Sequence, residues 1–236
     1  MRELIERYVR ELVKIPSTSN TETEKSCADY IAEELAKQPY FKEYPEQTGK
    51  YLLPEDSFDR SVPWGLVKGR NGSRKTIILT GHYDVVDTEE YGNERALAYD
   101  VEKWENLVKS GNALPGMPEE VKEDFLSGEW MFGRGTADMK GGLSVGLALL
   151  DWYGKLVVEA ERKDCGTAAF ETKTASGTEE TPEISGNLLF VTVPDEEGYS
   201  AGMRGAVPFL NDLKERFDLE YTALIDLEPA SMENGA

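Results

Sequence analysis

The sequence is short of basic residues, histidine, cysteine and long apolar runs. It contains 26 Lys and Arg but 45 Asp and Glu, so its formal net charge is −19. A protein that binds nucleic acid needs a surplus of basic side chains to displace counterions from phosphates, and an anionic membrane surface attracts the same surplus. The composition therefore predicts no nucleic-acid partner and no membrane partner, and it favours the binding of cations.

Targeting signals and disulfides are also missing from the pattern. The most apolar run, residues 143–150, is far shorter than the roughly 20 residues that cross a bilayer. The N-terminus is charged from Arg2 onward, unlike a signal peptide. The two cysteines, Cys27 and Cys165, lie far apart and indicate no disulfide framework. These features predict a protein of the reducing cytoplasm.

Amphipathic helices alternate with apolar strands along the chain. Helical spacing of apolar residues predicts helices over residues 2–14, between Thr21 and Pro39, and over 139–157 and 200–217. Short apolar runs predict buried strands over 76–80, 188–193 and 221–225. Such alternation predicts an α/β fold, with a mixed, mostly parallel sheet and helices on both faces.

Three stretches do not fit this alternation. Residues 40–63, rich in Pro, Tyr and charge, predict a loop with one strand at most. Residues 88–130 are charged and contain two prolines, which indicates an excursion from the sheet with a short helix near 119–126. Residues 159–186 have many threonines and few large apolar residues, so we expect a polar surface insertion or loop.

Polar residues follow each predicted strand at once. His82 and Asp84 follow the first strand, Asp195–Glu197 follow the second, and Asp226 and Glu228 follow the third. Ligands of α/β sheets bind at the carboxyl ends of the strands, so these side chains are expected at one edge. A fourth cluster, residues 133–142, places Asp138 among glycines at the start of a helix.

One histidine with several carboxylates suits zinc, because imidazole nitrogen and carboxylate oxygen are both zinc ligands. Two metals need a carboxylate that bridges them, and a further carboxylate can act as general base. The adjacent Glu196 and Glu197 could divide these two roles. A calcium or magnesium site made from carboxylates alone is an alternative, although His82 at a strand end argues against it.

Three motifs together resemble a known family. They are Gly81–Asp84, Gly133–Gly142, and Asp195–Glu197 with Ser200–Gly202 just after. They resemble the dinuclear-zinc metallopeptidases and amidohydrolases, which include aminoacylases, succinyl-diaminopimelate desuccinylase and glutamate carboxypeptidases. The Pro-Asp-Glu-Glu sequence and the 88–130 excursion look most like the bacterial arginine-utilisation branch, the RocB-like proteins. The resemblance covers residues 1–153 and 187–230.

The resemblance implies a role for each site residue. His82 resembles a ligand of one zinc, and Asp84 resembles the carboxylate that orients its imidazole. Asp138 resembles the carboxylate that bridges both metals. Glu196 resembles the general base, and Glu197 a ligand of the other zinc.

The resemblance also implies a further ligand, an acid before Pro or Gly at a later strand end. Glu228, followed by Pro229, fits best, with Asp226 as its rival. The implied cofactor is zinc, two ions for each complete site, with cobalt or manganese as substitutes. The implied reaction is hydrolysis of an amide bond in an N-acyl amino acid or a peptide.

The sequence departs from the family in two respects. Family members complete the site with a histidine near the end of a longer chain, and they carry a smaller lid domain; neither has a counterpart here. We therefore expect residues 1–236 to form a truncated, partial catalytic domain with exposed strand edges that promote self-association. The competing hypothesis is a non-catalytic acidic fragment, or an interaction protein that keeps the fold without turnover.

Overall fold

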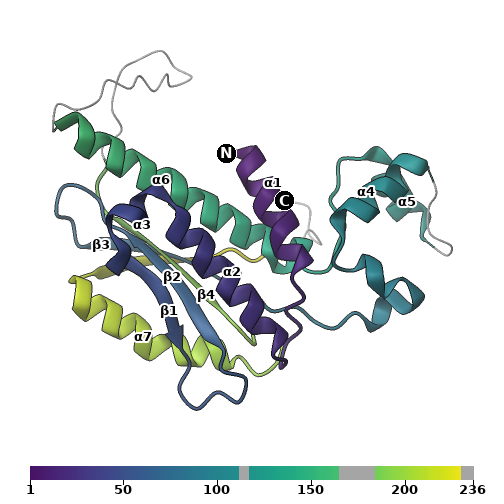
Figure 1. Cartoon of the computed structure of the whole chain (residues 1–236), viewed down its shortest axis with the longest axis horizontal. Helices are drawn as coiled ribbons and strands as arrows, with labels where there is room; N and C mark the ends of the chain where they lie inside the picture. Colours follow the sequence, from purple (N-terminus) through teal and green to yellow (C-terminus); the bar gives the residue numbers. More distant parts are fainter. Residues whose placement is uncertain (112–116, 165–183, 230–236) are drawn as a thin grey trace.

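A five-stranded mixed sheet forms the centre of the protein (Figure 1). The computed structural model describes residues 1–111, 117–164 and 184–229. The strands, in their order across the sheet, are β1 (Thr48–Leu52), β2 (Ser61–Val67), β4 (Asn187–Val193), β3 (Lys75–His82) and β5 (Glu220–Asp226). β2 runs antiparallel to both of its neighbours, whereas β3 pairs in parallel with β4 and β5. Four of the five strands therefore point in one direction, and the predicted mixed α/β sheet is confirmed.

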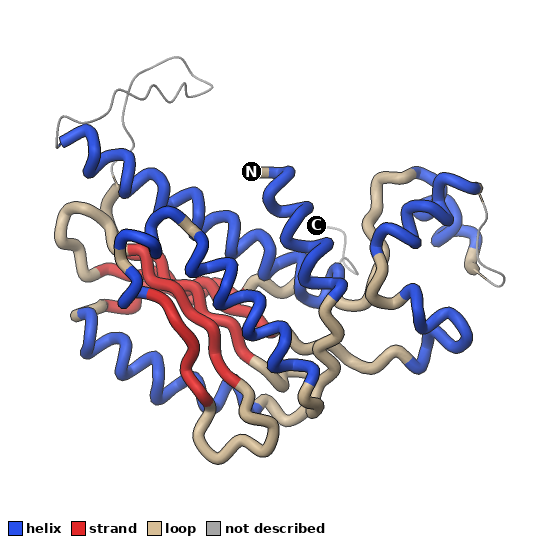
Figure 2. The backbone as a smooth tube through the Cα atoms, viewed as in Figure 1, coloured by secondary structure: helices blue, strands red, loops and turns tan. Residues whose placement is uncertain are grey.

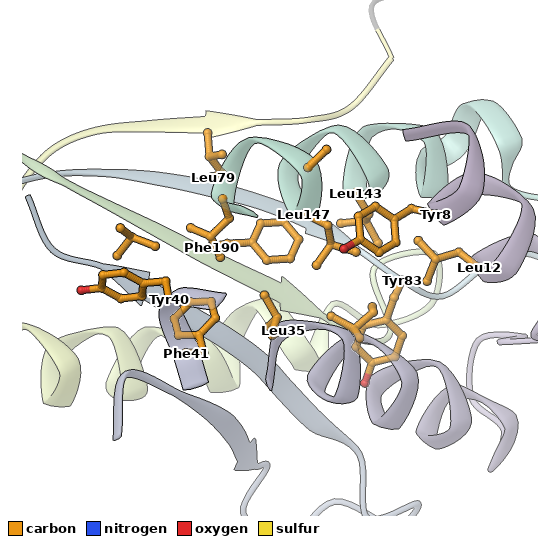
Figure 3. Close-up of a cluster of buried hydrophobic side chains, with 14 of the residues drawn as sticks. Tyr8, Leu12, Leu35, Tyr40, Phe41, Leu79, Tyr83, Leu143, Leu147 and Phe190 are labelled. Carbon is orange, nitrogen blue, oxygen red and sulfur yellow. The ribbon is translucent and has the colours of Figure 1, made fainter. Parts of the chain in front are cut away.

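Helices cover both faces of the sheet, as the sequence predicts (Figure 1). On one face lie α1 (Arg2–Lys14), α2 (Thr23–Lys37), α3 (Pro39–Glu43) and α6 (Gly142–Asp164). On the other face lies α7 (Ala201–Phe217), which contains Pro208. The alternation along β4 supplies both cores: Phe190 packs with Leu143 and Leu147 of α6 (Figure 3), whereas Leu189 and Val191 pack with α7. A strand buried on both faces reads as a continuous apolar run, which is why its sequence identifies it.

The prediction for residues 40–63, a loop with one strand at most, is wrong in part. This segment contains α3, the 3₁₀ turn η1 (Pro45–Gln47), β1 and the start of β2. The strand β2 is difficult to predict from the sequence because it contains Pro63 and Gly65, and both residue types are unusual in a central strand. A Cβ on Gly65 would lie 2.7 Å from the ring of Phe41, so the close packing of a helix on the strand explains the glycine.

Two further predictions need correction. α6 continues to Asp164, so the predicted polar loop over 159–186 begins too early; residues 165–183 of that loop lie outside the described residues. The strand predicted at 221–225 is β5, but it is exposed rather than buried. It occupies an edge of the sheet with β3 as its one strand neighbour among the described residues, and Leu224 and Ile225 are about half exposed.

The 88–130 excursion lies beside the sheet (Figure 2). It contains the 3₁₀ segment η2 (Glu89–Leu97), α4 (Val101–Ser110) and α5 (Glu119–Ser127), the last of which matches the predicted short helix. Trp104 packs with Leu97 and Phe125 in a small core of its own. Across the described ranges, no helix is long and apolar enough to cross a membrane.

Candidate metal centre

The carboxyl ends of β3, β4 and β5 meet at one edge of the sheet. His82, the last residue of β3, is in register with Val193 of β4, and Thr80 is in register with Asp226 of β5. The N–H of Leu227 donates to the carbonyl of Thr80 at 3.0 Å, which holds the segment before Glu228 against β3. The topology thus brings together polar residues that are more than a hundred positions apart in the sequence.

Three carboxylates face the outer nitrogen of the His82 ring. The Nε2 atom lies 2.9 Å from Oδ1 of Asp138, 3.0 Å from Oε1 of Glu228 and 3.9 Å from Oε2 of Glu196. The imidazole is 1% exposed, whereas these carboxylates border a polar pocket of about 260 Å³. The pocket is lined by Gly81, His82, Asp138, Glu196, Met203, Asp226 and Glu228.

The inner nitrogen of His82 has a fixed partner. Its Nδ1 lies 2.9 Å from the backbone carbonyl of Asp84 and 3.4 Å from the Asp84 carboxylate. A carbonyl oxygen can only accept, so Nδ1 carries a proton and donates it. In the neutral ring this arrangement leaves the Nε2 lone pair directed at the pocket, the tautomer that a metal ligand requires.

The pKa of His82 is raised to about 9. Burial lowers it, but the hydrogen bond and charge of Asp84, together with the charges of Glu228 and Asp138, outweigh burial. In the absence of a metal the ring is therefore an imidazolium at neutral pH, with Nε2–H donating to Asp138. The proton occupies the position that a divalent cation would take.

Asp84 connects the histidine to the Glu196–Glu197 pair. Its carboxylate accepts the Ser19 hydroxyl at 2.6 Å, the Glu196 N–H at 3.0 Å and the Glu197 N–H at 3.1 Å. Burial by itself would raise the pKa of Asp84, but the bonds from His82, Ser19 and Glu196 hold it below its usual value. Asp84 is thus a buried anion that orients both the imidazole and the backbone that carries two glutamates.

Asp138 lies in an irregular turn, Thr136–Gly141, just before α6. Gly135, with a φ of 78°, opens this turn in the left-handed region that glycine adopts without steric cost. The buried ammonium of Lys140 donates to the carbonyls of Leu12 at 3.0 Å and Ile15 at 2.8 Å, and so fastens the turn to the end of α1. The Asp138 side chain remains 56% exposed and lines the pocket, where it meets His82 Nε2.

The donor set fits a metal ion. One ligand atom from each of His82, Asp138 and Glu228 lies within 4.8 Å of the others. Burial raises the pKa of Glu197 and of Glu228, and the charge of Asp138 raises both further. Crowded carboxylates around one imidazole are relieved by a cation, and the nitrogen–oxygen set matches zinc.

The structure places the remaining candidates around this group. Glu196 and Asp226 line the pocket, while Glu197 interacts with the charges of Asp138 and His82 from outside the pocket lining. Glu228, rather than its rival Asp226, is the residue whose carboxylate meets His82. Sequence reasoning missed Ser19, which stands near no recognisable motif, and Met203, which directly follows the Ser200–Gly202 motif.

No family model matches the sequence. Protein RocB of Bacillus subtilis (strain 168) is 31% identical over 226 residues, which cover 96% of this chain and 35% of RocB. Uncharacterized protein YqjN of the same organism is 35% identical over 219 residues, 92% of this chain and 34% of YqjN. The chain therefore spans about a third of the length of these curated relatives.

Solved structures share the fold at low sequence identity. Human carnosine dipeptidase 1 has a TM-score of 0.54 at 13% identity and matches 95% of this chain and 38% of its own. LapB from Legionella pneumophila has a TM-score of 0.53 at 14% identity, with 98% and 43% covered. The di-peptidase Dug1p from Saccharomyces cerevisiae has a TM-score of 0.52 at 19% identity, with 95% and 38% covered.

The described residues share the fold of these solved structures, as the resemblance predicts. The predicted resemblance to the N-terminal part of RocB-like proteins, a branch of the dinuclear-zinc metallopeptidases and amidohydrolases, is confirmed by the two Bacillus subtilis relatives. The similarity to RocB and YqjN extends over nearly the whole chain.

Proposed function

We propose that this chain carries the zinc site of a hydrolase that cleaves an amide bond in a small peptide or an N-acyl amino acid. The observation that supports this most directly is the position of His82 Nε2, 2.9 Å from Asp138 and 3.0 Å from Glu228. The backbone carbonyl of Asp84 fixes the tautomer of the same ring from behind. A buried, oriented imidazole that faces two carboxylates is a donor set for zinc.

The residues divide into metal ligands and a base. His82 and Glu228 would hold one zinc, Glu197 the other, and Asp138 would bridge the two; cobalt or manganese could replace zinc at such a site. A bound zinc polarises a carbonyl group and makes water a better nucleophile at neutral pH. Asp226, which also lines the pocket, is left as a neighbour whose charge strengthens the attraction for cations.

Glu196 is the proposed general base. Its side chain is 42% exposed, lines the pocket and lies 3.9 Å from His82 Nε2, so a water molecule in the pocket could reach it. Glu196 would accept a proton from the attacking water and transfer it to the amine that leaves. Its N–H bond to Asp84 at 3.0 Å fixes the backbone from which this carboxylate extends.

A second candidate is a cation-binding protein without turnover, consistent with a single histidine in the sequence. Both candidates bind metal, so they differ in hydrolysis. A site for calcium or magnesium would use oxygen ligands alone. Such a site would not explain why the Asp84 carbonyl orients the His82 imidazole towards the pocket.

Zinc stoichiometry by atomic spectroscopy, with His82→Ala and Glu94→Gln compared with the unmodified chain, tests the site. We expect specific zinc in the unmodified chain and in Glu94→Gln, an exposed control, and its loss in His82→Ala. Retention of the same zinc by His82→Ala would refute the ligand assignment.

Hydrolysis of dipeptides and N-acyl amino acids then tests the reaction. In any zinc-loaded form that shows turnover, Glu196→Gln should keep the metal and lose about 10²–10⁴-fold in rate, the range for a general base. Turnover that survives this substitution would remove Glu196 from the role of base. Zinc binding without hydrolysis of either substrate class would favour the second candidate.

A further inference from the structure

A buried ionic cluster lies next to the loop that carries Glu196 and Glu197. It consists of Glu24, Arg60, Asp56 and Asp195, each at most 7% exposed in its side chain. None of these residues lines the pocket. Buried charged groups are costly unless each one is paired and hydrogen-bonded. The hydrogen-bond partners of this cluster therefore show which segments of the chain it connects.

Glu24 is the member that reaches the metal-binding loop. Its Oε2 accepts the backbone N–H of Asp195 at 2.9 Å, and its Oε1 accepts the N–H of Asn20 at 2.8 Å. The spacing of Thr21 and Glu24 matches a capping box in the sequence, but the structure differs. The Thr21 hydroxyl donates to the Thr18 carbonyl. Glu24 instead points into the interior, where it accepts from Asp195, a residue 171 positions further along the sequence.

Arg60 provides the counter-charge. Its guanidinium donates to Glu24 at 3.0 Å, forms a forked pair with Asp56 and lies 3.4 Å from the Asp195 carboxylate. Burial raises the pKa of Glu24 to about 7, while the hydrogen bond and charge of Arg60 act to lower it. Arg60 therefore favours the ionised form of Glu24, the form that accepts from three donors at once.

Asp195 turns the chain towards the site. Its φ of 61° lies in the left-handed region, which non-glycine residues adopt when surrounding contacts hold them there. Its carboxylate accepts the N–H of Ala201 at 2.9 Å, the first residue of α7, and so caps that helix. Gly198 packs closely against the same turn, because a Cβ at this position would lie 2.4 Å from the side chain of Asn20 and 2.5 Å from that of Asp195.

Three consecutive backbone N–H groups, those of the loop Asp195–Glu197, therefore donate hydrogen bonds to buried carboxylates. Asp195 donates to Glu24, and Glu196 and Glu197 donate to Asp84. Asp84 belongs to the motif at the end of β3, whereas Glu24 belongs to α2, outside every motif of the site. The loop that carries the proposed base and one proposed ligand is thus held from two independent elements.

We propose that Glu24 is a positioning residue of the metal centre: by holding the Asp195 N–H, with Arg60 as its counter-ion, it fixes the loop that presents Glu196 and Glu197. The part of this proposal that concerns metal binding rests on the proposed function. The part that concerns the position of the loop rests on the hydrogen bonds alone. Glu24 touches neither metal nor substrate, so its effect acts through the backbone.

Zinc affinity, measured by competition with a chromophoric chelator at pH 8, tests the first part. Glu24→Gln keeps the shape of the side chain but removes one acceptor and the charge. We expect it to weaken zinc binding by about tenfold or more, within the range for residues that orient metal ligands. Asp56→Asn is the matched control, because it removes an equal charge from the same cluster without touching the loop. Glu33→Gln, exposed on the same helix, controls for surface effects.

Hydrogen exchange of the Asp195, Glu196 and Glu197 amides in the metal-free chain tests the second part. We expect Glu24→Gln to speed exchange at these amides by about tenfold or more, while the core strands stay protected. If Glu24→Gln does not fold, Glu24→Asp replaces it, since it keeps the charge and shortens the reach to Asp195. Circular dichroism confirms that each variant is folded at the temperature used.

The outcomes separate the two proposals. Unchanged zinc affinity and unchanged exchange in a folded Glu24 variant overturn the positioning role. Equal losses in Glu24→Gln and Asp56→Asn also overturn it, because general destabilisation of the cluster then explains both. If the unmodified chain binds no specific zinc, the proposed function fails, and the exchange rates still decide whether Glu24 positions the loop.

Discussion

The carboxylate of Asp84 accepts the backbone N–H of Glu197 at 3.1 Å, although the two residues are 113 positions apart. The same carboxylate accepts the Glu196 N–H and lies 3.4 Å from the imidazole of His82. One buried anion therefore fixes the relation between the histidine of β3 and the glutamates that follow β4. This relation makes the orientation of the imidazole and of the glutamate pair interdependent.

Asp84→Asn is expected to disturb the orientation of the His82 imidazole and of the Glu196–Glu197 pair at once. The amide has one acceptor oxygen where the carboxylate has two, so a buried donor loses its partner at a cost of about 1–3 kcal/mol in stability. Removal of the charge should also bring the pKa of His82 down from about 9. His82 is the single histidine of the sequence, so its imidazole resonances in a proton NMR titration of the untagged chain report the change directly.

The control for this experiment is Asp87→Asn, an exposed aspartate three positions further on. It should leave the His82 titration and the stability of the chain unchanged. A His82 pKa that stays near 9 in Asp84→Asn would show that Asp138 and Glu228 account for the rise.

The metal-free chain should lose stability as the pH rises from 6.5 to 9. The folded-state pKa of His82 is raised from 6.5 to about 9, so the folded state binds this proton more tightly than the unfolded state does. The resulting stabilisation is complete below pH 6.5 and disappears as the pH passes 9; its upper limit is about 3 kcal/mol. Urea unfolding of the chelator-treated chain and of His82→Gln should show the wild-type advantage shrinking across this interval. A constant difference between the two proteins would contradict the prediction.

Two glycines of α7 should respond differently to alanine. A Cβ on Gly202 would lie 2.1 Å from the carbonyl oxygen of Pro194, a backbone atom that cannot move without shifting the adjacent Asp195. A Cβ on Gly205 would instead meet the end of the Leu53 side chain, 2.5 Å away, which can change its rotamer. We expect Gly202→Ala to cost about 1–3 kcal/mol from overpacking and Gly205→Ala to cost clearly less. Thermal or urea unfolding of both variants measures the difference, and equal costs would refute the argument.

Exposed β5 should promote self-association. Leu224 is 56% exposed and Ile225 is 47% exposed on a strand at the edge of the sheet. Unpaired edge strands with apolar side chains are templates for association, and a lysine on the edge opposes it. Sedimentation velocity should show concentration-dependent association of the unmodified chain that decreases in Leu224→Lys. A monomer at every concentration tested would contradict this expectation.

The inner strands β3 and β4 were predictable from the sequence. Residues 76–80 and 188–193 are apolar runs, and both are strands of the structure. The apolar stripe of residues 2–14 likewise matches α1. By contrast, β2 contains Pro63 and Gly65, which sequence patterns treat as breakers; its seven residues are buried because helices pack on it and neighbouring strands pair with it.

The candidate site was predictable where its residues form motifs at strand ends. His82, Asp138, Glu196 and Glu228 converge as the α/β topology requires. The preference for Glu228 over Asp226 as the partner of His82 came from the resemblance, and the distance of 3.0 Å now supports it. Glu24 could not be identified in this way, because a glutamate in the first turn of a helix ordinarily serves as a cap.

The sequence by itself determined the alternation of helices and strands, the acidic surface and the identities of the donor atoms, since these depend on local composition and on periodicity. Only the tertiary structure decided which face of each element is buried, that β5 lies at an exposed edge, and that Asp84 and Glu24 both bind the loop at Asp195–Glu197. Those features depend on contacts between segments far apart in the chain. Burial then gives these contacts their effect, because a carboxylate shielded from water takes its hydrogen bonds from the protein.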